Sequence, residues 1–116
     1  MANIYHLGYP KVRYEDNNGE ALSGGLVYFY TNGTSTKKDT YPTLADALAG
    51  TNANTNPVVL DSRGEATIVL KGPYKIVLAP AGDTDPPTNA IWTSDNINTI
   101  NDIYDSNANK LLTLTG

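Results

Sequence analysis

Apolar positions in the first part of the chain follow the spacing of β-strands. Tyr5, Leu7 and Tyr9 alternate with other residues, which indicates an extended arm with one apolar face. Pro10 lacks the backbone N–H that a central strand donates, so we expect the arm to be an edge strand or to dock on a surface. Residues 24–30 are apolar or aromatic at consecutive positions. They therefore predict a central strand that is covered on both faces.

The middle of the chain reads as three strands joined by short turns. Residues 57–60 and 65–70 flank Asp61-Ser62-Arg63-Gly64, which fits a type I turn followed by a left-handed residue. Residues 71–73 form the next turn, and residues 74–78 are the third strand. We expect these three strands to pair as an antiparallel meander.

One short segment breaks the strand pattern and predicts a helix. Thr43 is a suitable N-cap, Asp46 lies in the first turn, and Gly50 ends the helical pattern. Leu44 and Leu48 are four residues apart and share one helical face. The helix would have about two turns and could not be stable alone.

The C-terminal part is expected to contain a strand, a helix and a second strand-like run. Residues 90–93 predict a short strand, which Ser94 or Asp95 would end by capping a helix. The helix would continue through three apolar residues with spacings of three and four, which suit either a seam between helices or packing on the chain's own sheet. These residues are Ile97, Ile100 and Tyr104. Residues 110–115 are strand-like but lack a predicted partner strand, which favours a longer parent chain.

Composition narrows the class of protein. The chain has 116 residues, enough for one domain, and its net charge of −4 excludes the basic footprint of a nucleic-acid-binding protein. It has no cysteine, so it has neither a disulfide framework nor a thiolate metal site. No signal-peptide pattern and no apolar run of about 20 residues is present, so we expect no membrane contact and synthesis in the cytoplasm without a signal peptide. With 8 Tyr, 10 Gly and 7 Pro, the fold class is mainly β.

Carboxylates provide two candidates for chemistry. Asp61 and Glu65 resemble the paired carboxylates of a glycoside hydrolase, although a hairpin turn explains their spacing equally well. Asp83, Asp85 and Asn89 offer oxygen ligands for calcium, but their spacing is not that of an EF-hand, and a solvated loop explains them better.

Histidine and aromatic residues provide the remaining candidates. His6 is the single histidine, and no Gly-x-Ser-x-Gly motif accompanies it, so we expect a packing or surface role. Exposed tyrosines and Trp92 would stack on sugar rings in a carbohydrate-binding module. Because these aromatic residues lie in strand patterns, burial in a core or an interface is the stronger expectation.

A longer set of motifs, taken in order, is similar to a known family. It comprises residues 19–30, ending Gly-Gly-Leu-Val-Tyr-Phe-Tyr, then 33–34, 40–41, 56–66 with Asn-Pro-Val-Val-Leu-Asp-Ser-Arg-Gly-Glu-Ala, 74–78 with Tyr-Lys-Ile-Val-Leu, and 91–97 with Ile-Trp-Thr-Ser-Asp-Asn-Ile. This set resembles the N-terminal virion-anchoring domain of bacteriophage tail fibres and tailspikes, especially those of short-tailed phages. Residues 43–55 look longer than the equivalent loop, and residues 104–112 resemble the start of a fibre shaft.

The resemblance implies a structural role in the virion tail. It implies a homotrimer whose N-terminal domains attach to the phage tail or the head–tail connector, without enzymatic activity or a cofactor. Residues 1–97 would be the anchoring domain, with residues 1–20 as its arm, and residues 98–116 a linker or the start of the shaft. We expect a small antiparallel β-sandwich or barrel-like domain with one short helix and a C-terminal helical or shaft-start segment.

Two groups of residues are candidate contact sites. Tyr5, Leu7 and Tyr9 are the candidate contact with the virion, unless the arm packs on its own domain. The candidate trimer interface consists of apolar residues near the C-terminal end, namely Ile97, Ile100, Tyr104, Leu111, Leu112 and Leu114. The competing functions are a carbohydrate-binding module that contacts a host glycan and a small hydrolase that uses Asp61 and Glu65.

Overall fold

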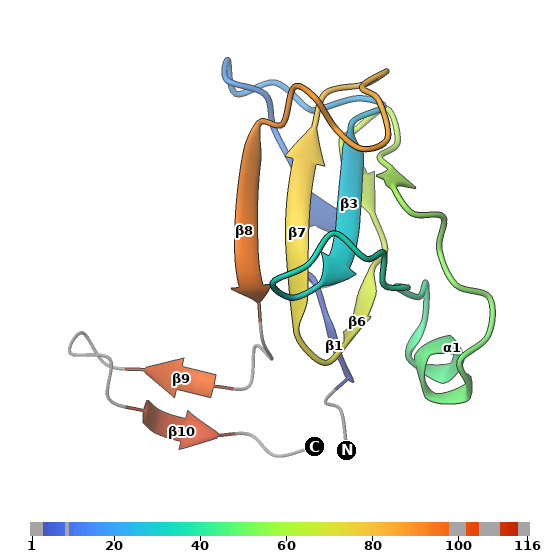
Figure 1. Ribbon diagram of the computed structural model, residues 1–116, viewed down its shortest axis with the longest axis vertical. Helices are drawn as coiled ribbons and strands as arrows, with labels where there is room; N and C mark the ends of the chain where they lie inside the picture. Colours follow the sequence, from blue (N-terminus) through green and yellow to red (C-terminus); the bar gives the residue numbers. More distant parts are fainter. Residues whose placement is uncertain (1–3, 9, 98–101, 105–109, 114–116) are drawn as a thin grey trace.

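The computed structural model describes residues 4–8, 10–97, 102–104 and 110–113. Antiparallel strands and one short helix make up this part of the chain, which confirms the mainly β class (Figure 1). The elements are β1 (Ile4–His6), β2 (Val12–Arg13), β3 (Leu26–Thr31), α1 (Leu44–Ala49), β4 (Val58–Val59), β5 (Glu65–Ala66), β6 (Val69–Lys71), β7 (Tyr74–Ala79), β8 (Trp92–Ile97), β9 (Asp102–Tyr104) and β10 (Lys110–Thr113).

The main sheet has four strands in the order β4-β3-β7-β8. β3 pairs with β7 along its whole length, from Leu26 opposite Ala79 to Thr31 opposite Tyr74. Its other edge pairs with β4 through Leu26 and Val27. The prediction of a central strand in this region is therefore confirmed.

Two shorter ladders lie behind the main sheet and complete the core. β1 pairs with β6 through Tyr5 and Leu70, and β2 pairs with β5. Figure 1 shows β1 and β6 behind β3 and β7. The face of the main sheet that meets these ladders, here called the inner face, packs into one apolar cluster. Its buried members are Tyr5, Leu22, Val27, Phe29, Val58, Leu60, Ile68, Leu70, Tyr74, Ile76 and Leu78.

The predicted meander is wrong, although its first turn is correct. Gly64 has a φ of 70° and donates from its backbone N–H to the Asp61 carbonyl at 3.0 Å, as the turn requires. Beyond the turn the strands separate, because β4 pairs with β3 whereas β5 pairs with β2. β7 likewise leaves β6 and lies between β3 and β8. β7 pairs with β3 on one edge and with β8 on the other, so neither edge is left for β6. Nearly every side chain of β7 is buried, as expected for a strand covered on both faces.

The predicted helix is confirmed at both ends. The Thr43 side chain accepts a hydrogen bond from the Asp46 N–H at 3.1 Å, and Gly50 ends the helix with a φ of 72°. Helix α1 packs against β1 and β6, and Ala47 is its buried residue. Leu44 and Leu48 are 46% and 73% exposed, so the two leucines that share a face do not form the packed face of the helix.

The C-terminal part differs from the prediction in two ways. Ser94 and Asp95 lie inside β8, so neither begins a helix; Ser94 pairs with Ile76 of β7 instead. The open edge of β7 offers a row of backbone partners, which outweighs a local helix-capping signal. β10 confirms a strand at residues 110–113, but it pairs with β9, so the expectation that it lacks a partner is wrong. Residues 98–101, 105–109 and 114–116, including Ile100 and Leu114, lie outside the described residues.

Candidate functional site

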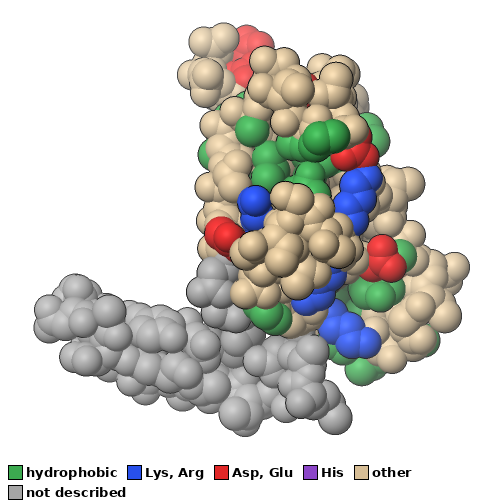
Figure 2. Space-filling model, viewed as in Figure 1, with side chains coloured by type: hydrophobic (Ala, Val, Ile, Leu, Met, Phe, Trp, Pro, Cys, Tyr) green, Lys and Arg blue, Asp and Glu red, His purple; other side chains and the backbone are tan. Residues whose placement is uncertain are grey.

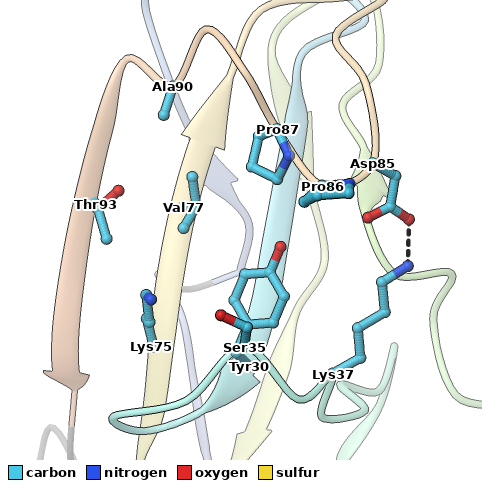
Figure 3. Close-up of a pocket in the computed structure, with 10 residues that line it drawn as sticks. All are labelled: Tyr30, Ser35, Lys37, Lys75, Val77, Asp85, Pro86, Pro87, Ala90 and Thr93. Atoms are coloured by element: carbon cyan, nitrogen blue, oxygen red, sulfur yellow. Dashed lines mark hydrogen bonds and ion pairs between the residues drawn. The ribbon is translucent and has the colours of Figure 1, made fainter.

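A hollow of about 420 Å³ opens on the outer face of the main sheet, the face turned away from β1 and β6. Side chains of β3, β7 and β8 and of two loops line it (Figure 3). Its volume is within the range of pockets that hold small molecules. The lining residues are Tyr30, Ser35, Lys37, Lys75, Val77, Asp85, Pro86, Pro87, Ala90 and Thr93.

The floor of the hollow follows from side-chain alternation along the central strands. Successive residues of a strand point to opposite faces of its sheet, so Tyr30 and Phe29 lie on different faces. Tyr30 packs with the Val77 side chain of β7 on the outer face, and both residues are buried. The floor is therefore apolar, with a phenol ring at its base.

The loop of residues 80–90 forms one wall, and a single carboxylate organises it. Asp83 accepts hydrogen bonds from the backbone N–H groups of Thr84 at 2.8 Å and Asn89 at 2.9 Å, and from the Thr88 hydroxyl at 2.9 Å. Hydrogen bonds from backbone N–H groups, that of Asn89 foremost, hold the pKa of Asp83 at about 2. The Tyr28 hydroxyl donates to the Thr84 carbonyl at 2.6 Å and ties the same loop to β3.

The calcium candidates lie in this loop with other partners. Asp83 receives the hydrogen bonds of its own loop, and Asp85 forms an ion pair with Lys37. No group of three or more acidic or histidine side chains is placed to hold a metal ion in the described part of the chain. Within the described residues, both carboxylates therefore have hydrogen-bond or ion-pair partners of the chain itself.

The loop of residues 32–37 forms the opposite wall and is connected to three other segments. The Gly33 N–H donates to the Asp95 carboxylate of β8 at 2.9 Å. The Lys37 ammonium donates to the Asn56 carbonyl at 2.9 Å and pairs with Asp85. Because these contacts join the two loops to each other and to the sheet, the hollow is formed before any ligand enters.

The charged groups of the hollow lie on its two sides. Lys37 and Asp85 are on one side and Lys75 is on the other, with Tyr30 between them (Figure 3). The Lys75 nitrogen is 5.8 Å from the centre of the Tyr30 ring, within the range of a cation–π contact. Burial, together with the charge of Asp85, raises the pKa of Tyr30, so this phenol stays neutral. Figure 2 shows apolar side chains in a depression on this face, with basic side chains beside it.

The chemistry of this arrangement favours binding. Its groups are an apolar floor, two ammonium groups, a paired carboxylate and the hydroxyls of Ser35 and Thr93. The other candidate, the Asp61 and Glu65 pair, is explained by its turn, because Asp61 accepts from the backbone N–H groups of Arg63 at 2.8 Å and Glu65 at 3.1 Å. These bonds, that of Glu65 foremost, lower the pKa of Asp61, as expected for a carboxylate that accepts backbone hydrogen bonds in a turn.

The predicted virion-contact residues occupy different positions. Tyr5 is only 3% exposed, and its hydroxyl donates to the Gly72 carbonyl at 2.7 Å. Leu7 is partly buried against the same core, and Tyr9 lies outside the described residues. The position of Tyr5 matches the alternative in which the arm packs on its own domain, and contact with the virion stays a prediction.

The predicted trimer residues and Trp92 are distributed over the last strands. Ile97 ends β8 and packs partly buried against the core, whereas Tyr104 belongs to β9. Leu111 and Leu112 belong to β10. Trp92 is 36% exposed and meets Tyr14 edge to face, with ring centres 5.6 Å apart. The expectation that Trp92 is buried in the core is therefore wrong, and its burial in an interface stays a prediction.

Sequence reasoning did not identify the hollow. The apolar pattern of residues 24–30 correctly predicts the strand of Tyr30, but Lys37, Lys75 and the two prolines belong to segments that meet only in the folded chain. The one feature of the sequence that points to this face is the alternation of tyrosines in β3, which places Tyr28 and Tyr30 on the same side of the sheet.

Comparison with known proteins does not place the chain in a family. No protein-family model matches it, and no curated protein matches it significantly. None of the helices in the described residues has the length and apolar character needed to cross a membrane.

Proposed function

We propose that this chain is a structural adaptor domain that attaches a trimeric phage tail fibre or tailspike to the virion tail or the head–tail connector. The ordered motifs between residues 19 and 97 support this family. The layered packing of the main sheet on the β1-β6 and β2-β5 ladders supports a β-sandwich, and residues 1–97 would form the anchoring domain. The chain would act in the virion tail, without a catalytic site.

The observation that carries the proposal is the open edge of β8. This strand has six residues and is the last strand of the main sheet, and no other strand of the described residues pairs with its outer edge. It contains neither lysine nor proline; its one charged side chain, Asp95, accepts a hydrogen bond from the Gly33 N–H, and its ladder with β7 has one register shift. An extended segment of the virion protein can therefore add to the sheet here as a fifth strand.

An adaptor also has to be rigid, and the centre of the main sheet has an unusual brace. The Asn56 side chain accepts from the Phe29 N–H at 3.0 Å and donates to the Phe29 carbonyl at 2.7 Å. It donates to the Lys38 carbonyl as well, at 3.1 Å. One amide side chain thus occupies the place of a neighbouring strand beside β3 and links three segments.

A binding assay with purified phage tails and connectors tests the adaptor role. The chain should co-sediment with one of them, and Thr93→Lys should weaken binding by roughly ten-fold, because a lysine on the β8 edge opposes strand addition. Thr36→Lys is the matched control, since Thr36 is also exposed but lies outside β8. Absence of binding to both particles would contradict the proposal, and equal binding by the two variants would contradict the β8 contact.

The homotrimer is the second part of the proposal. Static light scattering should give the mass of three chains, with Ile97 and residues of β9 and β10 at the contact. A monomeric mass at high concentration would contradict trimer formation by this chain.

The hollow favours a second function, which is the binding of a sugar. The apolar floor can pack against a sugar ring, and the hydroxyl and ammonium groups of the lining can form hydrogen bonds with its hydroxyls. A host glycan would be the partner in that case.

A further inference from the structure

The hollow has a positively charged rim on an acidic protein. The chain carries a net charge of −4, yet two lysines and one aspartate line the hollow. Lys37 and Asp85 compensate each other, so the lining keeps a net positive charge from Lys75. A recess with net charge attracts ligands of the opposite sign, and we therefore expect a ligand with negative charge.

The two lysines are not equivalent. Lys37 is held by Asp85 and by the Asn56 carbonyl, so its charge is already compensated. The ion pairs formed within the described residues are Arg13 with Glu15 and Lys37 with Asp85, and Lys75 belongs to neither. Lys75 is therefore the cation that an entering anion can contact.

The remaining groups indicate the body of the ligand. Tyr30, Val77 and the two prolines provide apolar surface, against which the C–H groups of a pyranose ring can pack. The hydroxyls of Ser35 and Thr93 both donate and accept hydrogen bonds, as sugar hydroxyls require. The volume of about 420 Å³ has room for a sugar ring.

We propose that this hollow binds one sugar ring that bears a carboxylate, such as a uronic acid, with the carboxylate on Lys75 and the ring on the Tyr30 side of the floor. This inference rests on the second proposed function, sugar binding, and deepens it by naming the charge of the sugar. It is independent of the adaptor role. The two loops bound the hollow on opposite sides, which favours a single ring over an extended acidic peptide.

Isothermal titration and saturation-transfer NMR with D-glucuronate test the proposal on the full chain. We expect D-glucuronate to bind with millimolar affinity and the neutral analogue D-glucose to bind at least about five-fold more weakly, because an exposed ion pair contributes about 1 kcal/mol. In Lys75→Met the two sugars should bind equally. Lys11→Met is the matched control, since Lys11 is exposed and does not line the hollow. Thr93→Trp is the second variant, which fills the hollow from an exposed position and should abolish the signal.

Four outcomes would overturn the proposal. They are no signal with glucuronate at tens of millimolar, equal binding of glucose, unchanged binding by folded Lys75→Met, and competition by acetate or N-acetylglutamate amide as strong as that by glucuronate. The last result would assign the site to simple carboxylates or acidic peptides. A tetramer of galacturonate shows whether the natural ligand is a polysaccharide or a free sugar acid. Binding of the tetramer supports a residue of an acidic polysaccharide as the ligand, and binding of the monomer alone supports a free sugar acid. Lys75→Met should lose the preference for glucuronate but still bind phage tails. The sugar titration and the tail-binding assay therefore test the two proposed functions separately.

Discussion

The two faces of β3 carry similar residues but have different surroundings. On the inner face, Phe29 is fully buried and meets Tyr74 edge to face, with ring centres 5.9 Å apart. On the outer face, Tyr28 and Tyr30 are also buried, but loops take the place of a second layer of strands: Tyr28 bonds to the loop of residues 80–90, and Tyr30 lies at the floor of the hollow. The inner face therefore depends on side-chain packing, whereas the outer face depends on hydrogen bonds that hold one loop in place.

This difference separates stability from binding. A close-packed core transmits any change of volume to its neighbours, so the inner face tolerates little variation. On the outer face, Tyr28 and Asp83 hold the loop of residues 80–90, and Lys37 joins that loop to the loop of residues 32–37. Substitutions of exposed residues that line the hollow can therefore change which ligand it binds, with little effect on the stability of the fold.

The largest effect is expected from Phe29→Ala on the inner face. Removal of a buried phenyl ring should lower the free energy of unfolding by about 3–5 kcal/mol, because a cavity remains beside Tyr74. Urea unfolding monitored by circular dichroism measures this change. Leu48→Ala, at an exposed position of α1, is the control and should change the free energy by less than about 0.5 kcal/mol. A change of similar size in both variants would contradict the assignment of the core.

A smaller effect is expected from Tyr28→Phe on the outer face. The variant loses the hydrogen bond from the hydroxyl to the Thr84 carbonyl, which should cost about 1 kcal/mol, because water can reach the exposed loop. Tyr74→Phe is the inner-face counterpart. Its hydroxyl donates to the Asp39 carbonyl at 2.6 Å and accepts from the Lys71 N–H at 3.0 Å, so both partners lose a bond.

The two tyrosine variants sharpen the comparison of the faces. Tyr74→Phe should cost about 1–3 kcal/mol and exceed Tyr28→Phe in the same urea titration. Hydrogen exchange should become faster in the loop of residues 80–90 only in Tyr28→Phe. Equal costs, or exchange that changes in both variants alike, would show that the loop and the core unfold as one unit.

Local signals in the sequence predicted the parts of the fold that depend on neighbouring residues. The caps of α1 were predictable because Thr43 and Gly50 act within one helical turn. The turn at Asp61 was predictable for the same reason, since its carboxylate bonds to N–H groups two and four residues ahead. The fully apolar pattern of β3 likewise predicted a strand covered on both faces.

Strand pairing and the hollow were not predictable, because they depend on distant segments. Nothing near β7 indicates that β3 and β8 pair with it while β6 pairs with β1. Ser94 carries a helix-cap signal, but its strand partner is Ile76 of β7. The hollow brings Lys37, Lys75 and the prolines together only after those pairings form, and the sequence offers no motif for such a set.

The smallest change in stability at neutral pH is expected from Asp83→Asn. The pH dependence of this change distinguishes the loop of residues 80–90 from the core. The folded pKa of about 2 lies below the ordinary value of 3.8, so the carboxylate contributes stability that is fully present above pH 3.8 and is lost as the pH falls through 2. The advantage of the native chain over Asp83→Asn in thermal unfolding midpoint should therefore shrink between pH 5 and pH 2. Asp46 and Asp61 also have lowered pKa values, but they remain in both chains, so the difference isolates Asp83. After correction for intrinsic rates, hydrogen exchange of the Asn89 N–H should become faster than that of core amides as the pH falls from 5 to 2. A difference in unfolding midpoint between the two chains that does not change with pH would contradict the role of the ionised carboxylate.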